Sequence, residues 1–189
     1  MKNIPFSDLT KGTLLISTPD VDSGPFFRTV LLLCENNHTG SFGITINQAI
    51  DIQLPEEILD IEQADNPNIR LLSGGPVQSN QMMILHSCEE EPSQTIKIAP
   101  QVFLGGDLNF LQKLILKDDG IYINMCFGYA GWAAGQLERE YLDGGWFLTQ
   151  GNAKNIFTIP PEDMWKTLLR DLGGKYATYS TMPDDLSLN

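Results

Sequence analysis

The sequence predicts an α+β protein in which a mixed β-sheet curls on itself. Stretches rich in strand-forming residues outnumber stretches with helical periodicity, and the two kinds do not alternate strictly along the chain. A doubly wound parallel sheet requires that alternation, so it is not expected here. The 189 residues are 42% hydrophobic and contain no long linker, so we expect one domain with a buried core over residues 1–189.

Strands are predicted where apolar and β-branched residues cluster between turn residues. The polar turn at residues 35–40 (ENNHTG) joins two such runs, at residues 28–34 and 41–47, and predicts a β-hairpin. Residues 121–127 (IYINMCF) are the clearest central strand, because they are dense in strand formers and flanked by glycine. Further strands are expected at residues 12–18, 68–72, 82–86, 95–99, 102–104 and 145–149.

Two helices have recognisable ends in the sequence. Asp107 is a suitable N-cap for a helix over residues 108–116, in which leucine and isoleucine recur at helical spacing. A last helix is expected to start at residues 160–162 (PPE) and to end at Leu172, before two glycines. We predict an acidic helix or ordered loop over residues 55–65. Residues 175–189 are expected to form an irregular tail.

Residues 127–140 (FGYAGWAAGQLERE) are predicted to turn from the central strand into a helix over residues 130–142. On that helix, Trp132 would lie opposite the buried face, as a surface anchor or beneath another segment such as the tail. Gly131 and Gly135 would lie on its flank, at a cost of about 1 kcal/mol each relative to alanine. These glycines would allow either the close approach of another backbone or the access of a ligand to the helix. The buried face would consist of Ala130, Ala133, Ala134, Leu137 and Tyr141.

Three glycine-containing turns follow predicted strands, at residues 74–76, 105–107 and 128–131. If they meet at one edge of the sheet, their backbone N–H groups form a crevice that can bind a ligand. The alternative is that each is an ordinary turn. The G-x-x-G spacing matches neither the dinucleotide-binding pattern nor the P-loop. The crevice would be formed by Arg28, Gly74, Gly75, Gly128, Gly131, Trp132, Gln136 and Glu138.

Arg28 follows two phenylalanines and precedes an apolar strand, so we expect its guanidinium group to be partly buried. A buried guanidinium group needs a carboxylate or another anion beside it. A structural salt bridge is the first hypothesis, and an anion-binding role is the second. The candidate carboxylates for the salt bridge are Asp20, Asp22, Glu35 and Glu138.

The net charge of −12 is distributed unevenly. Between Thr29 and Ile96 there are ten acidic residues and a single base, Arg70. Such a surface repels nucleic acid and anionic lipid, and it is compatible with a basic protein partner or with solubility alone. No stretch of roughly 18 apolar residues could span a membrane. Residues 1–12 lack the apolar core of a signal peptide, so we expect a cytoplasmic protein.

Candidate catalytic groups are few. The odd number of cysteines without CxxC spacing predicts reduced, buried thiols and neither a disulfide framework nor a zinc site. Cys126 ends the central strand before Gly128, where a helix N-terminus could activate its thiol; ordinary burial is the alternative. His86 and Cys88 could pair on one strand face or simply lie at a strand end, and His38 falls in the predicted turn. Neither G-x-S-x-G nor HExxH occurs, and no metal or cofactor is expected.

Eight short blocks follow one another along nearly the whole chain: GTLLISTP (12–19), FRTV (27–30), GITIN (43–47), GGPV (74–77), FGYAGW (127–132), QLE (136–138), PEDMW (161–165) and LSLN (186–189). Together, these blocks resemble the YqgE/AlgH family of bacterial proteins. The resemblance implies a bifurcated sheet folded into a pseudo-barrel with flanking helices, and no established activity. Some members carry a label as transcriptional regulators linked to alginate control. Asn36 stands where the family usually has a histidine, so a role resting on that histidine does not carry over.

The sequence leaves three functional hypotheses. The first is a non-enzymatic binding protein, or a regulator that acts indirectly, whose glycine crevice takes a small ligand or a protein partner. The second is an enzyme with an unrecognised site at Cys126 or Arg28, in the same crevice. The third, a regulator that binds DNA directly, ranks last because of the acidic charge and the lack of a helix-turn-helix, a basic helix or a zinc pattern.

Overall fold

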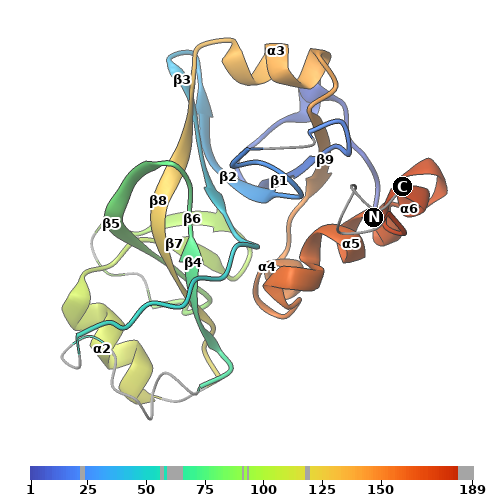
Figure 1. Ribbon diagram of the computed structural model, residues 1–189. Helices are drawn as coiled ribbons and strands as arrows, with labels where there is room; N and C mark the ends of the chain where they lie inside the picture. Colours follow the sequence, from blue (N-terminus) through green and yellow to red (C-terminus); the bar gives the residue numbers. More distant parts are fainter. Residues whose placement is uncertain are drawn as a thin grey trace.

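The computed structural model describes residues 1–21, 24–55, 58, 66–90, 92, 94–117 and 120–182 (Figure 1). Over these residues the chain forms nine β-strands, five α-helices and a short 3-10 turn, η1 (Phe6–Asp8). The strands belong to one mixed sheet that curls, and the helices lie around it. This arrangement confirms the predicted α+β class.

Four antiparallel strands form one end of the sheet. They are β1 (Thr13–Ser17), β2 (Val30–Asn37), β3 (Gly40–Thr45) and β9 (Trp146–Gln150). β1 lies between β2 and β9, and β2 pairs with β3. Asn37 lies opposite Gly40 where β2 turns into β3, so the predicted hairpin is confirmed.

The other end of the sheet is built around its long strand β5. Its members are β4 (Ile69–Ser73), β5 (Val77–His86), β6 (Ile96–Ala99) and β7 (Val102–Leu104). β5 begins at Val77 rather than at residue 82, because Val77 pairs with Tyr129 across a shift in register. The intervening polar residues are exposed and carry no apolar alternation, so the sequence pattern did not reveal this half of the strand.

The strand β8 (Ile123–Ala133) joins the two ends. Its first half lies between β4, which runs parallel to it, and the antiparallel β5, whereas its second half pairs with β3. The sheet therefore divides at β8, with the order β6-β7-β5-β8-β3-β2-β1-β9 and β4 beside this path. This is the bifurcated, curled sheet that the family resemblance implied (Figure 1).

The helix predicted over residues 130–142 begins only at α3 (Gln136–Leu142). Residues 130–133 belong to β8, in which Ala130 and Trp132 are buried and Gly131 and Ala133 are exposed, the two-residue period of a strand. The prediction for these residues was wrong because small residues fit both a helical and a strand period. Pairing with β3, where Gly43 lies opposite Ala130, decides between them.

The two helices with recognisable ends lie where the sequence predicted them. α2 (Leu108–Lys117) begins after Asp107, whose Oδ1 accepts a hydrogen bond from the backbone N–H of Phe110 at 2.8 Å. α5 (Pro161–Leu172) has proline at its first position and ends at Gly173. These ends were predictable because capping depends on local residue types.

Two shorter helices were not predicted. α4 (Ala153–Phe157) is capped by Asn152, whose side chain accepts a hydrogen bond from the backbone N–H of Asn155 at 2.9 Å. α6 (Gly174–Tyr179) replaces the first part of the tail that was expected to be irregular, because Tyr176 and Tyr179 pack on the ring of Phe147. The acidic segment 55–65, apart from Pro55 and Ile58, and the LSLN block at 186–189 lie outside the described residues.

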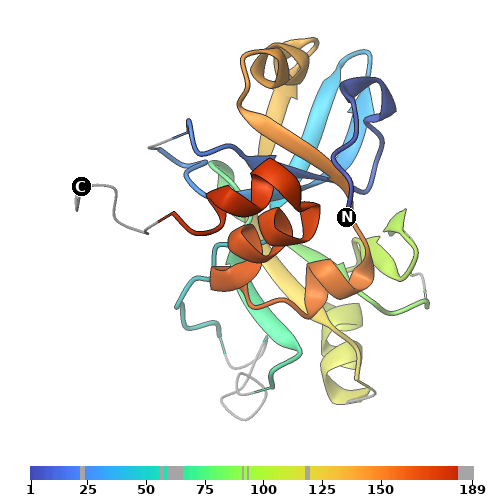
Figure 2. The same ribbon diagram turned by 90° about the vertical axis from the view of Figure 1, so that its right-hand side faces the viewer.

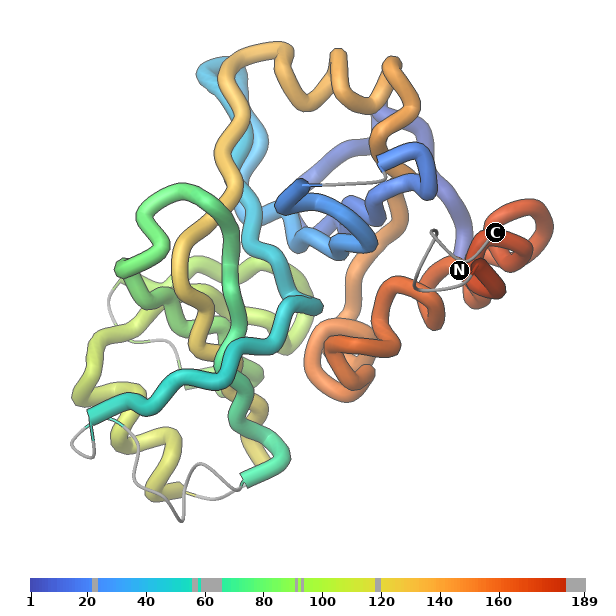
Figure 3. The backbone as a smooth tube through the Cα atoms, viewed as in Figure 1, coloured from blue at the N-terminus to red at the C-terminus, as the bar shows by residue number. Residues whose placement is uncertain are grey.

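Three apolar clusters lie between the sheet and the helices that cover it. The largest lies between the sheet and α4 and α5, which stand with α6 before the sheet in Figure 2. A second lies between the sheet and α2, and a third lies under α3 and includes Trp132 and Trp146. β1 is buried on both faces, because Leu14 faces the first of these clusters and Leu15 the third. Figure 3 shows the chain rising along β8, crossing through α3 and descending into β9.

Candidate functional site

The glycines of the predicted crevice lie at a close approach of two backbones. A Cβ atom on Gly74 would contact the backbone of Gly128, and one on Gly128 would contact the backbone of Gly75. The N–H of Gly74 donates to the carbonyl of Phe127 at 2.7 Å. Of the two interpretations of these glycines, the geometry favours backbone packing. Gly131 is exposed on β8, and the turn at residues 105–107 packs elsewhere, against residues 94–95 and 110.

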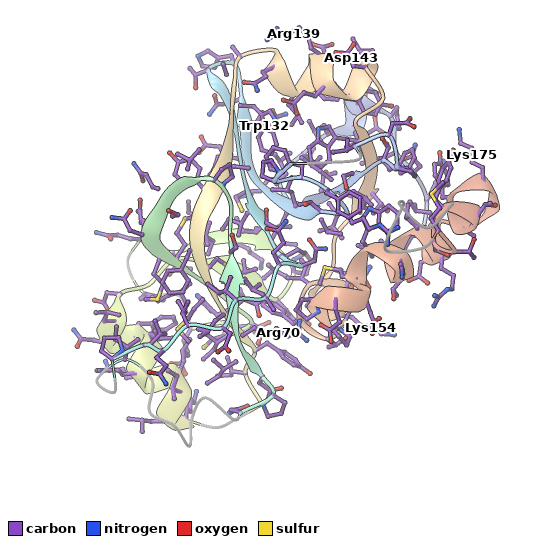
Figure 4. All side chains as sticks on the ribbon, in the orientation of Figure 1. Arg70, Trp132, Arg139, Asp143, Lys154 and Lys175 are labelled. Atoms are coloured by element: carbon purple, nitrogen blue, oxygen red, sulfur yellow. The ribbon has the colours of Figure 1, made fainter. Side chains whose placement is uncertain are left out.

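Trp132 lies on the buried face of β8, contrary to the expectation that it would lie opposite a buried helical face. Only 5% of its surface is exposed. Its indole packs edge-on against that of Trp146, with ring centroids 6.4 Å apart, so the cover comes from β9 and α3. Figure 4 shows Trp132 beneath the α3 end of the sheet.

Glu140, on α3, is the acceptor at the centre of this cluster. Its Oε2 accepts hydrogen bonds from the indole N–H of Trp132 at 2.8 Å and of Trp146 at 3.0 Å. Its Oε1 accepts from the side-chain amide of Gln136 at 3.0 Å. The amide oxygen of Gln136 in turn accepts from the backbone N–H of Ala133 at 3.1 Å. The carboxylate is therefore held in one orientation by donors from β8, α3 and β9.

A cavity of about 310 Å³ opens beside this carboxylate. Phe26 and Trp146 form an aromatic wall, with ring centroids 5.6 Å apart and planes at 66°. Three acidic side chains, those of Asp20, Glu140 and Asp143, also line it. We call it the aromatic–acidic cavity; the rest of its lining is Thr18, Val21, Gly144 and Gly145.

The loop before Phe26 is tied to the end of α3. The hydroxyl of Thr18 donates to the carbonyl of Gly144 at 2.7 Å, and its backbone N–H donates to the carbonyl of Gly145 at 3.0 Å. Figure 4 shows Asp143 at the end of α3, and Arg139 on the outer side of that helix. The cavity thus combines residues that lie more than a hundred positions apart in the sequence.

Arg28 lines a neighbouring, smaller cavity of about 130 Å³, which shares Asp20 and Val21 with the first. Its guanidinium carbon lies 5.0 Å from the ring centroid of Trp165, and its Nη2 donates to the carbonyl of Met182 at 3.3 Å. Its φ of 47° is in the left-handed region. The predicted salt bridge stays a prediction, since Asp22, one of its candidates, lies outside the described residues.

Glu138 lies apart from the other predicted residues. It is exposed on α3 and lines a third cavity of about 170 Å³, together with Asn36 and Gly135. Seven of the eight residues of the predicted crevice therefore divide between a glycine packing joint, the support of Glu140, and two other cavities, and Gly131 belongs to none of these groups. Trp132 and Gln136 contact Glu140, which lines the aromatic–acidic cavity. The sequence analysis did not predict Glu140, Trp146 or Phe26 as residues of this site. The sequence did contain one signal for Glu140: it lies four residues after Gln136 on the same helix, a spacing that brings the two side chains together.

Among the candidate catalytic groups, Cys126, Cys88 and His86 are buried, whereas His38 is exposed in the turn between β2 and β3. Cys126 lies inside β8 rather than at a helix N-terminus, and burial raises the pKa of its thiol to about 12. All three cysteines are free and buried. His86 is fully buried between Phe103 and Phe110, and burial lowers its pKa to about 4, against a smaller opposite effect of the Cys88 backbone. Neither imidazole nitrogen has a hydrogen-bond partner among the described residues.

Metal-binding clusters and membrane-spanning helices are both absent from the described residues. No cluster of three or more histidine, cysteine or acidic side chains that could hold a metal ion occurs in the part of the chain that the structure describes. Within the same residues, no helix has the length and apolar character needed to cross a membrane.

A curled, mixed sheet that divides at its longest strand and is flanked by helices defines the fold class of this protein. The chain belongs to the AlgH-like family, whose model matches residues 14–177. A UPF0301 protein of Chlamydia abortus is 51% identical over 189 residues, which cover the whole of both chains. A UPF0301 protein of Chlorobaculum tepidum is 34% identical over 188 residues, or 97% of this chain and 98% of that one.

Solved structures show the same fold. The solution structure of the AlgH protein from Pseudomonas aeruginosa has a TM-score of 0.70 and 26% identity, and covers 98% of this chain and 100% of that chain. The crystal structure of a Corynebacterium diphtheriae protein has a TM-score of 0.71 and 22% identity, over 96% and 95% of the two chains. The names of these relatives specify no activity.

Proposed function

We propose that this protein is a non-enzymatic binding protein that takes a small ligand, or a side chain of a protein partner, in the aromatic–acidic cavity. One observation carries the proposal: the carboxylate of Glu140 is fixed by two indole N–H groups at the border of an aromatic-walled cavity. A polar group held in place before binding loses little conformational entropy when a ligand arrives. The volume of the aromatic–acidic cavity, about 310 Å³, lies at the lower end of the range for small-molecule sites.

The chemistry of the other candidate groups supports binding rather than catalysis. A nucleophilic cysteine needs a lowered pKa and access to solvent, whereas burial raises the pKa of Cys126. A general base needs a reachable lone pair and a pKa near the working pH, whereas burial encloses His86 and lowers its pKa. A net charge of −12 supports a partner other than nucleic acid. If the protein regulates transcription, we propose that it does so indirectly.

The remaining predicted residues have supporting parts in this proposal. Trp132 and Gln136 hold Glu140, and the glycines at positions 74, 75 and 128 hold β8 against the chain beside it. Arg28 and Glu138 belong to the two adjoining cavities. We infer that residues 1–189 act as one domain, since a relative matches the chain over its whole length. Buried free thiols are typical of a reducing compartment, so we place the protein in the cytoplasm.

Two adjacent phenylalanines provide a matched test. Phe26 lines the aromatic–acidic cavity, whereas Phe27 lines the neighbouring one, and both are half-buried. A fragment library is screened against the protein by ligand-observed NMR, and each hit is titrated against Phe26→Ala and Phe27→Ala. We expect hits whose affinity falls about tenfold in Phe26→Ala and stays unchanged in Phe27→Ala. The proposal fails if no fragment binds, or if every hit binds both variants equally.

A further inference from the structure

We propose that the ligand of the aromatic–acidic cavity is an organic cation, such as a protonated amine or a guanidinium group. The inference rests on the proposed function, because it assigns the ligand class of the same cavity. The charged group would lie among the three carboxylates, and the carbon chain would lie along Phe26 and Trp146. Charge, hydrogen bonding and ring chemistry each lead to this assignment.

The charge of the lining has one sign. Asp20, Glu140 and Asp143 line the cavity, and none of the described residues that line it is basic. Arg139, the nearest base along α3, lies on the outer side of the helix in Figure 4. Asp20 and Asp143 are exposed at the cavity, and Glu140 is half-buried. Carboxylates that border one cavity attract a cation and repel an anion.

The hydrogen-bond donors of the lining are largely occupied. The hydroxyl of Thr18 donates to the carbonyl of Gly144, and the indole N–H of Trp146 donates to Glu140. Backbone N–H groups around the cavity also have acceptors within the chain; they are those of Thr18, Val21, Asp143, Gly144 and Gly145. An anionic ligand would therefore find these donors already engaged.

Acceptors, in contrast, remain. A carboxylate has about four acceptor positions, and the three hydrogen bonds to Glu140 leave one for a ligand. The carbonyls of Gly144 and Gly145 each accept from Thr18 and have a second lone pair. An ammonium or guanidinium group supplies only donors, so it complements this lining.

The aromatic wall adds an attraction that neutral ligands lack. Cations are attracted to the faces of tryptophan and phenylalanine rings within about 6 Å of the centroid. The adjoining cavity contains such a contact, because the guanidinium carbon of Arg28 lies 5.0 Å from the ring centroid of Trp165. The half-buried ring of Phe26 offers a similar surface in the aromatic–acidic cavity.

A series of probes with equal chain length tests the charge. Pentylammonium, 1-pentanol and pentanoate are titrated into the protein, with the indole N–H signal of Trp146 followed by NMR. We expect pentylammonium to bind at least about tenfold more tightly than either other probe, and its affinity to fall as salt is added. A peptide with one lysine is the second source of the same cation. Binding as tight as that of pentylammonium indicates a partner side chain, and weaker binding indicates a free amine.

Charge-neutral variants separate the two proposals. Asp143→Asn and Asp20→Asn keep the volume of the lining, and each should weaken the binding of pentylammonium several-fold. Asp51→Asn removes an exposed carboxylate that does not line the cavity, so it should leave the affinity for pentylammonium unchanged. Equal binding of the three probes, or fragment hits that depend on Phe26 while no amine binds, would overturn the cation assignment alone. Binding of neither fragments nor amines would overturn the proposed function as well.

Discussion

Replacing Glu140 by alanine would leave two buried indole N–H groups without their acceptor. Oε2 of Glu140 accepts from Trp132 at 2.8 Å and from Trp146 at 3.0 Å, and these side chains are only 5% and 4% exposed. A buried donor left unsatisfied costs about 1–3 kcal/mol. We therefore expect Glu140→Ala to lower the free energy of unfolding by about 2–6 kcal/mol, against a typical total of roughly 5–15 kcal/mol.

Equilibrium unfolding in urea, followed by circular dichroism and tryptophan fluorescence, measures this loss. Glu140→Gln is the matched variant, because its amide oxygen can still accept from both indoles. Its NH₂ group, however, would face the amide NH₂ of Gln136, which donates to Oε1 in the native protein. We expect a loss smaller than that of Glu140→Ala, so a measurable variant remains even if the alanine variant does not fold.

A double-mutant cycle with Trp132→Phe identifies the source of the loss. Phenylalanine removes the N–H donor, so the cost of Glu140→Gln or Glu140→Ala should be smaller in that background. Residues in direct contact show coupling energies of about 0.5–3 kcal/mol. Losses that add within about 0.3 kcal/mol, or a Glu140→Ala variant as stable as the native protein, would refute the assignment of Glu140 as the shared acceptor.

Two further predictions concern the core. Because burial lowers the pKa of His86 to about 4 from 6.5, the unfolded chain binds more protons between these values, and stability should fall as the pH drops. The expected loss between pH 7 and pH 5 is about 2 kcal/mol in urea unfolding, and His86→Phe should remove it; an equal loss in that variant would contradict the assignment. Gly128→Ala should cost about 2–6 kcal/mol from its positive φ and its contact with the Gly75 backbone. Gly173→Ala, with a similar φ of 72° and open space around it, should lose only about 1–3 kcal/mol, and equal losses would exclude the packing explanation.

Local residue patterns were sufficient for most of the fold. The hairpin of β2 and β3, the cap at Asp107 and the ends of α5 depend on residues close in sequence, and all three lie where they were predicted. The end of β8 was mistaken because three of its last four residues, Ala130, Gly131 and Ala133, are small and suit either period. Their conformation is fixed by β3, which lies almost ninety residues earlier in the chain, and a local pattern does not contain that pairing.

The candidate site shows the same division between local and distant information. Trp132 and Gln136 were predicted to belong to the site because they lie in the glycine-rich stretch at residues 127–140, and both contact Glu140. Phe26 could not be connected with them, because it reaches the site through a loop more than a hundred residues away. The three glycine turns were expected to meet as one group, but only two of them do, because β6 and β7 carry the turn at residues 105–107 to another part of the sheet.

Glu140 connects the stability of the fold with the proposed binding, and the two roles can be separated. The indoles of Trp132 and Trp146 engage Oε2 from the core, whereas the charge that a ligand would meet is shared with Asp20 and Asp143. Substituting either aspartate therefore tests binding without disturbing the buried donors. Because the cavity lining comes from the loop before Phe26 and the end of α3, a bound cation would also hold these segments together. At about a hundred times its dissociation constant, the cation should raise the free energy of unfolding by about 2.7 kcal/mol. At the same concentration, the tenfold weaker affinity expected for Phe26→Ala should reduce this increase to about 1.4 kcal/mol.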